Sequence, residues 1–385
     1  MIPYARQDVS PADLKAVEDV LRSDFLTQGP AVERFERRVA DYVGARHAVA
    51  VSSATAALHL AYRALGLGPG DLLWTSPNTF VATANAALLC GAAVDFVDID
   101  ADTKNLSPES LKTKLIAAKK NGRLPKAVVP VHFAGQSCDM AAIGALAREF
   151  GIRVVEDASH AIGARYRGIP VGAGTHSDLT VFSFHPVKII TTGEGGMVLA
   201  QRDDLAGTVR LLRSHGITRE AARMEKVDEG PWYYEQVDLG LNYRLTDIQS
   251  ALGASQMDRL ESFIDRRHRL ADRYDRALAG LPLKLPVRPA GDRSALHLYP
   301  VEVTREPRAP ERRRVFDALR AAGVSANVHY IPVYLQPHYR RLGFKPGLCP
   351  VAERYYAGAI SLPMYPGLTE ADQDRVVDAM RRALA

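Results

Sequence analysis

The chain has 385 residues, of which 47% are hydrophobic and 24% are charged, a balance typical of a soluble globular protein. The formal net charge is +5, and the basic clusters at residues 266–269 and 312–314 have acidic neighbours and no interleaved aromatic residues. Solvated helix faces explain these clusters better than a nucleic-acid surface. No apolar run approaches the roughly 20 residues that span a bilayer, and the N-terminus has no signal-peptide core. We therefore expect a cytoplasmic protein that binds neither nucleic acid nor membrane.

Strands and helices alternate along the first 200 residues, beginning with a helix that Ser10 caps and Pro11 opens. This alternation predicts an α/β fold whose mainly parallel central sheet has helices on both faces. The expected strands are residues 48–51, 72–75, 94–97, 127–131, 152–155, 179–182 and 197–200. The expected helices are residues 54–64, 80–90 and 140–150, with another that begins at Ser107.

The pattern changes at residues 245–278, which form a long helical stretch with almost no helix-breaking residue. Later segments predict a strand at residues 296–303 and helices at residues 311–322 and 370–384. We expect a large domain over residues 1–250, followed by residues 251–385 as a long connecting helix and a small C-terminal α+β domain. The three widely spaced cysteines predict neither a disulfide framework nor a metal site.

Lys188 and the residues around it are the most informative part of the sequence about the reaction. It ends the segment 183–188 (Ser-Phe-His-Pro-Val-Lys) and precedes a Gly-rich turn, while Asp157 follows the apolar run of the strand at 152–155. A lysine amine can condense with the aldehyde of pyridoxal phosphate (PLP), and a strand-end aspartate can face its protonated pyridine nitrogen. The alternative is a surface lysine beside a turn, but the coincidence of these features favours PLP.

Other residues would suit the same cofactor. Residues 52–58 lead from a strand into a helix whose free amides can bind phosphate, and Ser183 would point at that phosphate; a plain helix cap is the alternative. Phe80 could stack on the pyridine ring or belong to the core. His160 could bond the phenolic oxygen or be a satisfied structural histidine. A buried Asp157 would require a cationic partner.

These segments resemble the fold-type I sugar aminotransferases of the DegT/DnrJ/EryC1/StrS family, and the resemblance covers essentially the whole chain. It extends to residues 26–30, 78–85, 213–216 and 239–247. The resemblance implies that Lys188 bonds PLP, that Asp157 faces the ring nitrogen, and that His160 faces the phenolic oxygen.

The resemblance also assigns the remaining cofactor contacts. Phe80 matches the stacking aromatic residue, and Ala54, Thr55 and Ser183 match phosphate contacts. Asn242 matches an asparagine that reaches the phosphate from a neighbouring subunit, which implies an obligatory homodimer with shared active sites. One departure is that many relatives have Asn-Gly-Thr where this chain has Ser-Ala-Thr at residues 53–55.

Within the family, residues 52–55, 185–188, 231–235 and 328–334 are most similar to members that act in pseudaminic acid biosynthesis. This similarity implies transfer of an amino group from L-glutamate to C4 of UDP-2-acetamido-2,6-dideoxy-β-L-arabino-hexos-4-ulose. One site would serve both substrates, which predicts ping-pong kinetics. Four residues in matching segments are candidate sugar contacts, and each could equally be structural: Thr27, Tyr299, His329 and Tyr330.

Other functions are conceivable for the same fold. The nearest alternative is a GDP-4-keto-6-deoxymannose 4-aminotransferase. A PLP-dependent sugar dehydratase is disfavoured because those relatives have histidine at the position of Lys188, and a non-catalytic regulator is disfavoured by the intact pair of Lys188 and Asp157. A nicotinamide oxidoreductase is disfavoured because no strand-turn-helix carries G-x-G-x-x-G.

Overall fold

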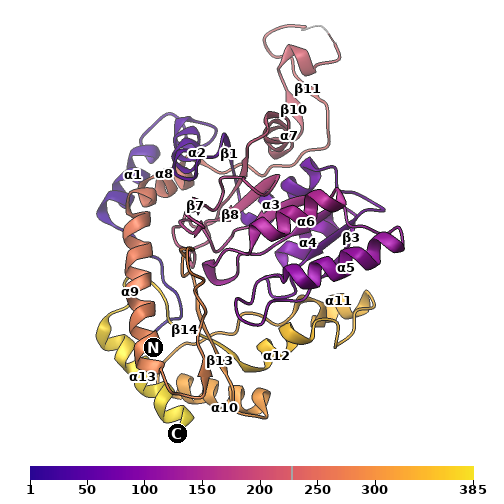
Figure 1. The fold of residues 1–385 in the computed structure, drawn as a ribbon. Helices are drawn as coiled ribbons and strands as arrows, with labels where there is room; N and C mark the ends of the chain where they lie inside the picture. Colours follow the sequence, from indigo (N-terminus) through magenta and orange to yellow (C-terminus); the bar gives the residue numbers. More distant parts are fainter. Residues whose placement is uncertain (227–228) are drawn as a thin grey trace.

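The computed structural model describes residues 1–226 and 229–385 (Figure 1). Within these residues the central sheet has seven strands in the order β1-β9-β8-β5-β4-β2-β3. Strand β9 is antiparallel to its neighbours β1 and β8, and the pairs from β8 to β3 are parallel. The strands are β1 (His47–Val51), β2 (Leu72–Thr75), β3 (Ala93–Phe96), β4 (Ala127–Val129), β5 (Arg153–Asp157), β8 (Leu179–Ser183) and β9 (Gly196–Ala200). The mainly parallel α/β fold expected from the sequence is confirmed.

Helices cover both faces of this sheet, because successive strand residues point to opposite sides. Leu73 and Val129 pack towards one layer of helices, whereas their neighbours Trp74 and Val128 pack towards the other. The first layer consists of α3 (Ala54–Ala64), α4 (Ala82–Leu89) and α7 (Asp203–Arg213). The second consists of α5 (Pro108–Lys120) and α6 (Met140–Phe150), with α2 (Pro30–Val43) covering the end of the sheet near β1.

The long helical stretch expected over residues 245–278 is interrupted. It forms α8 (Asp247–Gln256), a 3-10 turn (Met257–Arg259) and α9 (Leu260–Leu278). Arg259 pairs with Asp8 and with the buried Asp13 of α1 (Pro11–Leu21), so the turn places its guanidinium on the N-terminal segment. Tertiary ion pairing therefore overrides a helical propensity that contains no breaker.

Two strands are shorter than the sequence predicts. The strand expected at residues 127–131 ends at Val129, because the following Pro130 has no N–H for the ladder. The strand expected at residues 296–303 is β13 (Tyr299–Val303), because Leu296 has a φ of 49°, outside the extended region.

A second hydrophobic core lies in the C-terminal part of the chain. It is formed by α9, β13, β14 (Ala359–Leu362), α10 (Arg308–Ala321) and α13 (Glu370–Leu384). The first half of α9 packs on the core of the large sheet and its second half packs on this core. Ile2 also belongs to the second core and bridges Val324, so the N-terminal residues lie with the C-terminal segment. The division between residues 250 and 251 stays a prediction.

Short elements complete the molecule. The hairpin of β10 (Ile217–Thr218) and β11 (Glu235–Gln236) projects away from the sheet at the top of Figure 1. Others are β6 (Arg165–Tyr166), β7 (Ile169–Pro170), β12 (Leu283–Lys284), α11 (Pro337–Arg341), α12 (Pro350–Gly358) and the 3-10 turns Phe133–Gly135, Ala221–Arg223 and Val333–Leu335. In the described part of the chain, no helix combines the length and apolarity needed to cross a membrane.

Candidate active site

Lys188 lies in the loop that joins β8 to β9, and its side chain is partly buried. The loop is closed on itself, since Thr191 Oγ1 donates a hydrogen bond of 2.9 Å to the carbonyl of Phe184. Desolvation lowers the pKa of Lys188 to about 8, although the carboxylate of Asp157 opposes this shift. A larger fraction of this amine is therefore neutral, and nucleophilic, at neutral pH than for an exposed lysine.

Asp157 ends β5, and only 4% of its surface is exposed. Its carboxylate accepts hydrogen bonds from Thr83 Oγ1 at 2.7 Å, from Ser159 Oγ at 2.6 Å and from the Ser159 amide at 3.1 Å. These donors fix the orientation of the carboxylate, but none of them is charged. A protonated ring nitrogen would supply the positive partner that a buried carboxylate favours.

His160 lies three residues beyond the end of β5 and is buried, and its ring packs against aromatic neighbours. Tyr330 Oη lies 3.2 Å from His160 Nε2, and the ring centroid of His297 lies 4.4 Å from that of His160. Burial lowers the pKa of His160 well below its usual value, with further contributions from Lys188 and His329. The ring is therefore neutral, and its buried Nδ1 has no hydrogen-bond partner in the described chain.

The N-terminus of α3 and the end of β8 meet at Gly196. Gly196 is paired with Val51 in β1 and with Ser183 in β8, and a Cβ at Gly196 would lie 2.5 Å from the carbonyl of Ser53. This close approach brings Ser183 beside Ala54 and Thr55, the first residues of α3. The Ser53 side chain caps the helix through the amide of Ala56, so the helix cap and the proposed anion site coexist here.

Phe80 and Asn242 are both on the surface of the single chain. Phe80 lies just before α4, and 61% of its surface is exposed, which excludes the alternative that it is a core residue. Asn242 is exposed and forms a backbone bridge with Ser214. Their predicted roles, stacking on the cofactor and reaching a neighbouring subunit, stay predictions.

The four candidate sugar contacts lie in different surroundings. His329 is buried, and its Nδ1 lies 2.8 Å from Ser361 Oγ, while burial and Lys188 lower its pKa to about 3. Tyr330 contacts His160, as described above. Tyr299 packs inside the second core, and its hydroxyl donates a hydrogen bond to Asp275. These contacts favour a structural role for Tyr299 over a sugar contact. Thr27 is exposed and bridges Thr246.

Sequence reasoning missed two residues of this site. Thr83, which donates to Asp157, could have been noticed as a hydroxyl in an otherwise alanine-rich helix. His297 packs on His160 from a segment 137 positions away, and nothing in the local sequence indicates this contact.

These groups together fit PLP. The site contains an amine of lowered pKa, a buried carboxylate with neutral donors only, an unpartnered imidazole nitrogen and a helix N-terminus beside Ser183. PLP carries an aldehyde, a ring nitrogen, a phenolic oxygen and a phosphate, and each of them finds a suitable group here.

Comparison with known proteins identifies the family. Residues 7–381 match the model of the DegT/DnrJ/EryC1/StrS aminotransferase family. The chain is 40% identical to the spore coat polysaccharide biosynthesis protein SpsC of Bacillus subtilis, over 99% of this chain and 96% of the relative. It is 36% identical to the UDP-4-amino-4,6-dideoxy-N-acetyl-beta-L-altrosamine transaminase of Campylobacter jejuni, again over 99% and 96%.

Solved structures show the same fold over the whole chain. The aminotransferase PseC of Helicobacter pylori, involved in the biosynthesis of pseudoaminic acid, superposes with a TM-score of 0.90 at 31% identity, covering 100% of this chain and 99% of PseC. The PLP form of the sugar aminotransferase Spr1654 of Streptococcus pneumoniae gives a TM-score of 0.89 at 30% identity, with full coverage of both chains. The protein therefore belongs to the DegT/DnrJ/EryC1/StrS aminotransferase family and is an aminotransferase that uses PLP.

Proposed function

We propose that this aminotransferase moves the amino group of L-glutamate to C4 of the UDP-linked sugar UDP-2-acetamido-2,6-dideoxy-β-L-arabino-hexos-4-ulose, in pseudaminic acid biosynthesis. The observation that carries an amino-transfer function is the partly buried amine of Lys188, with its lowered pKa, beside Asp157. The particular sugar is supported by full-length likeness to the C. jejuni transaminase and to PseC. The 40% identity to SpsC, a spore coat polysaccharide biosynthesis protein, supports a carbohydrate pathway more generally.

Each residue has a distinct task in this proposal. When bound, PLP would supply the carrier for the amino group between the donor and the keto sugar. Lys188 Nζ holds the cofactor and, when neutral, removes the proton from the α-carbon of glutamate. Asp157 keeps a proton on the ring nitrogen, and His160 bonds the phenolic oxygen. Ser183, Ala54 and Thr55 bind the phosphate, and Phe80 covers the ring.

The substrate is tested by offering two keto sugars with L-glutamate and following 2-oxoglutarate and the aminated sugar. We expect the UDP-linked N-acetyl sugar to be aminated at C4, with parallel lines in double-reciprocal plots. Preference for GDP-4-keto-6-deoxymannose would replace the proposed substrate by the nearest alternative. Loss of the sugar hydroxyl without amination would indicate a dehydratase, and no turnover of any donor would indicate a regulator.

We also propose a homodimer in which Asn242 of one subunit contacts the phosphate bound by the other. Exposed apolar side chains that are close to Asn242 in the sequence support an interface, among them Leu239 and Trp232. Mixing the inactive variants Lys188→Ala and Asn242→Asp after joint refolding should restore up to about a quarter of the activity, since half of random dimers contain one intact site. No recovery in dimers shown to be mixed would contradict a shared site.

A further inference from the structure

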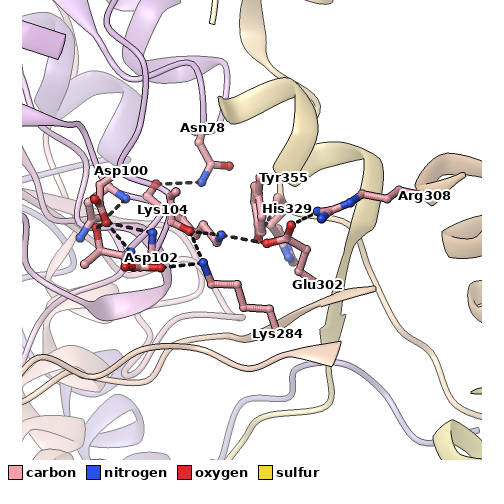
Figure 2. A network of polar contacts seen from close by, with 12 residues as sticks. Asn78, Asp100, Asp102, Lys104, Lys284, Glu302, Arg308, His329 and Tyr355 are labelled. Atoms are coloured by element: carbon pink, nitrogen blue, oxygen red, sulfur yellow. Dashed lines mark hydrogen bonds and ion pairs between the residues drawn. The ribbon is translucent and has the colours of Figure 1, made fainter. Parts of the chain in front are cut away.

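A buried ion-pair cluster joins the large sheet to the second core (Figure 2). Lys104, in the segment after β3, places its ammonium 2.8 Å from Glu302 of β13, and Glu302 also pairs with Arg308 of α10. Only 12%, 8% and 12% of these three side chains are exposed. Removing such charges from water costs free energy. Exposed ion pairs would join the two parts of the chain without this cost, so we expect a further role of the buried cluster.

Two neighbours of Lys104 in this network, Asn78 and Tyr355, contact one peptide unit, the one between His329 and Tyr330. The buried Asn78 donates from Nδ2 to the carbonyl of Lys104 at 3.1 Å and accepts at Oδ1 from the Tyr330 amide at 3.2 Å. Tyr355, whose ring lies 5.1 Å from the Lys104 ammonium, donates its hydroxyl to the carbonyl of His329 at 3.0 Å. Both polar groups of this peptide are therefore held by side chains of the network.

The contact between Tyr330 and His160 bears on which ring nitrogen of His160 carries the proton. Burial raises the pKa of Tyr330 above its usual value, so the hydroxyl keeps its proton, and His160 is neutral for the reason given above. The hydroxyl has His160 Nε2 as its hydrogen-bond partner, at 3.2 Å. If the hydroxyl donates to Nε2, the proton of the ring resides on Nδ1, the atom without a partner in the described chain.

We propose that Tyr330 fixes His160 in the tautomer protonated at Nδ1, and that Asn78 and Tyr355 are positioning residues that hold Tyr330 for this purpose. The inference rests on the proposed placement of His160 at the phenolic oxygen of PLP, where Nδ1–H would be the donor. Through these contacts, residues at the junction between the two cores would fix the hydrogen bond from His160 Nδ1–H to the phenolic oxygen, and with it the absorption spectrum of bound PLP.

The tautomer is tested directly by nitrogen NMR of the holoenzyme labelled at both histidine ring nitrogens, with His160→Gln to assign the signal. We expect a protonated Nδ1 in the wild-type protein and a shift of the proton towards Nε2 in Tyr330→Phe, which removes the donor but keeps the ring. The absorption maximum of bound PLP should move in the same variant. A wild-type ring protonated at Nε2, or an unchanged signal in Tyr330→Phe, would overturn the proposal.

The positioning role is tested by the pH at which the spectrum of bound PLP changes. Asn78→Ala and Tyr355→Phe should each move this pH in the direction of Tyr330→Phe, by up to about one unit. Adding Asn78→Ala to Tyr330→Phe should cause little further change, because both substitutions act through the contact of Tyr330 with His160. Full additivity of the two shifts would contradict the proposal that Asn78 acts through Tyr330.

Lys284→Gln is the matched control. It breaks an exposed ion pair with Asp102 at the same junction without contacting the peptide of His329 and Tyr330, so the spectrum should stay as in the wild type. An equal spectral change in this control would mean that the junction acts only by general loosening. Because the signals come from PLP and His160 alone, they are readable whichever keto sugar the enzyme accepts, and failure of the proposed substrate leaves this test intact.

Discussion

At the scale of single residues, the site depends on how each charge is solvated by the protein. Asp157 is stabilised by hydroxyl and amide donors, and Lys188 is desolvated by burial. Both residues could be identified from the sequence, because an acidic residue at a strand end and a lysine before a Gly-rich turn are local patterns. Thr83 donates to Asp157, and Asn78 accepts from the Tyr330 amide; the local sequence does not reveal the partner of either residue, because both contacts are tertiary.

Replacing Thr83 by valine should destabilise the apoprotein by about 2 kcal/mol, because a buried carboxylate oxygen of Asp157 loses its donor. The loss should be smaller when PLP is bound, since the ring nitrogen supplies a positive partner. Urea unfolding with and without PLP measures both effects. Thr208→Val is the matched control, since Thr208 bonds only a carbonyl on the exposed face of α7. Equal stability of the two variants would show that the Thr83 hydroxyl does not support Asp157.

The rate at which the apoprotein captures PLP should rise with pH and level off above about pH 8, the pKa of Lys188. About a tenth of the amine is neutral at pH 7 if the pKa is 8. Between pH 8 and 10.5 the unfolded chain binds more protons than the folded one, so this lysine also makes stability rise with pH across that window. Stopped-flow absorbance measures the capture, with Lys188→Arg as the inactive control. A rate that keeps rising to pH 10 would show an unshifted lysine.

At the scale of secondary structure, the site is assembled where strands end and helices begin. The buried strands could be predicted because short apolar runs bounded by turns are typical of strands inside a sheet. The helices α3 and α6 also occupy the residues expected. Two-residue strands such as β10 and β11 have no periodicity to detect. The break before α9 could not be predicted either, because it depends on Asp8 and Asp13, which are remote in sequence.

Gly196→Ala should weaken PLP binding and lower stability by about 1–3 kcal/mol, the usual cost of overpacking. The added Cβ would meet the backbone of Ser53 and Ala54 at 2.5–2.6 Å, forcing β9 away from the N-terminus of α3. Phosphate-dependent PLP affinity and thermal unfolding measure the two effects. Gly68→Ala is the control, since a Cβ there has no neighbour within 4 Å. Unchanged affinity for PLP would show that this junction does not shape the phosphate site.

At the scale of the whole molecule, two hydrophobic cores are joined by α9 and by the ion pairs of Lys104, and a cluster of buried histidines lies near Lys188. Burial lowers the pKa of His160, His297 and His329 below the ordinary 6.5. The unfolded chain therefore binds more protons than the folded one below this pH, and stability falls on acidification.

His297→Gln should reduce this acid sensitivity. The wild-type free energy of unfolding should fall between pH 6.5 and 5 with a slope that includes about 1.4 kcal/mol per pH unit from His297 alone, once the pH is well below 6.5. The variant should lose that part of the slope even if it is less stable throughout. Urea titrations at several pH values provide the slopes. An identical slope in the variant would show that His297 titrates alike in both states.

The bridge between Ile2 and Val324 has a consequence for protein synthesis. The Ile2 amide donates to the carbonyl of Gly323 at 2.8 Å, and the core that buries Ile2 is closed by α13, the last helix of the chain. During translation Ile2 must wait until α13 has left the ribosome before it meets all of its native neighbours. The large sheet can assemble earlier, because its strands are complete by Ala200. Ile2 is thus made before the large sheet and reaches its native contacts after that sheet can assemble.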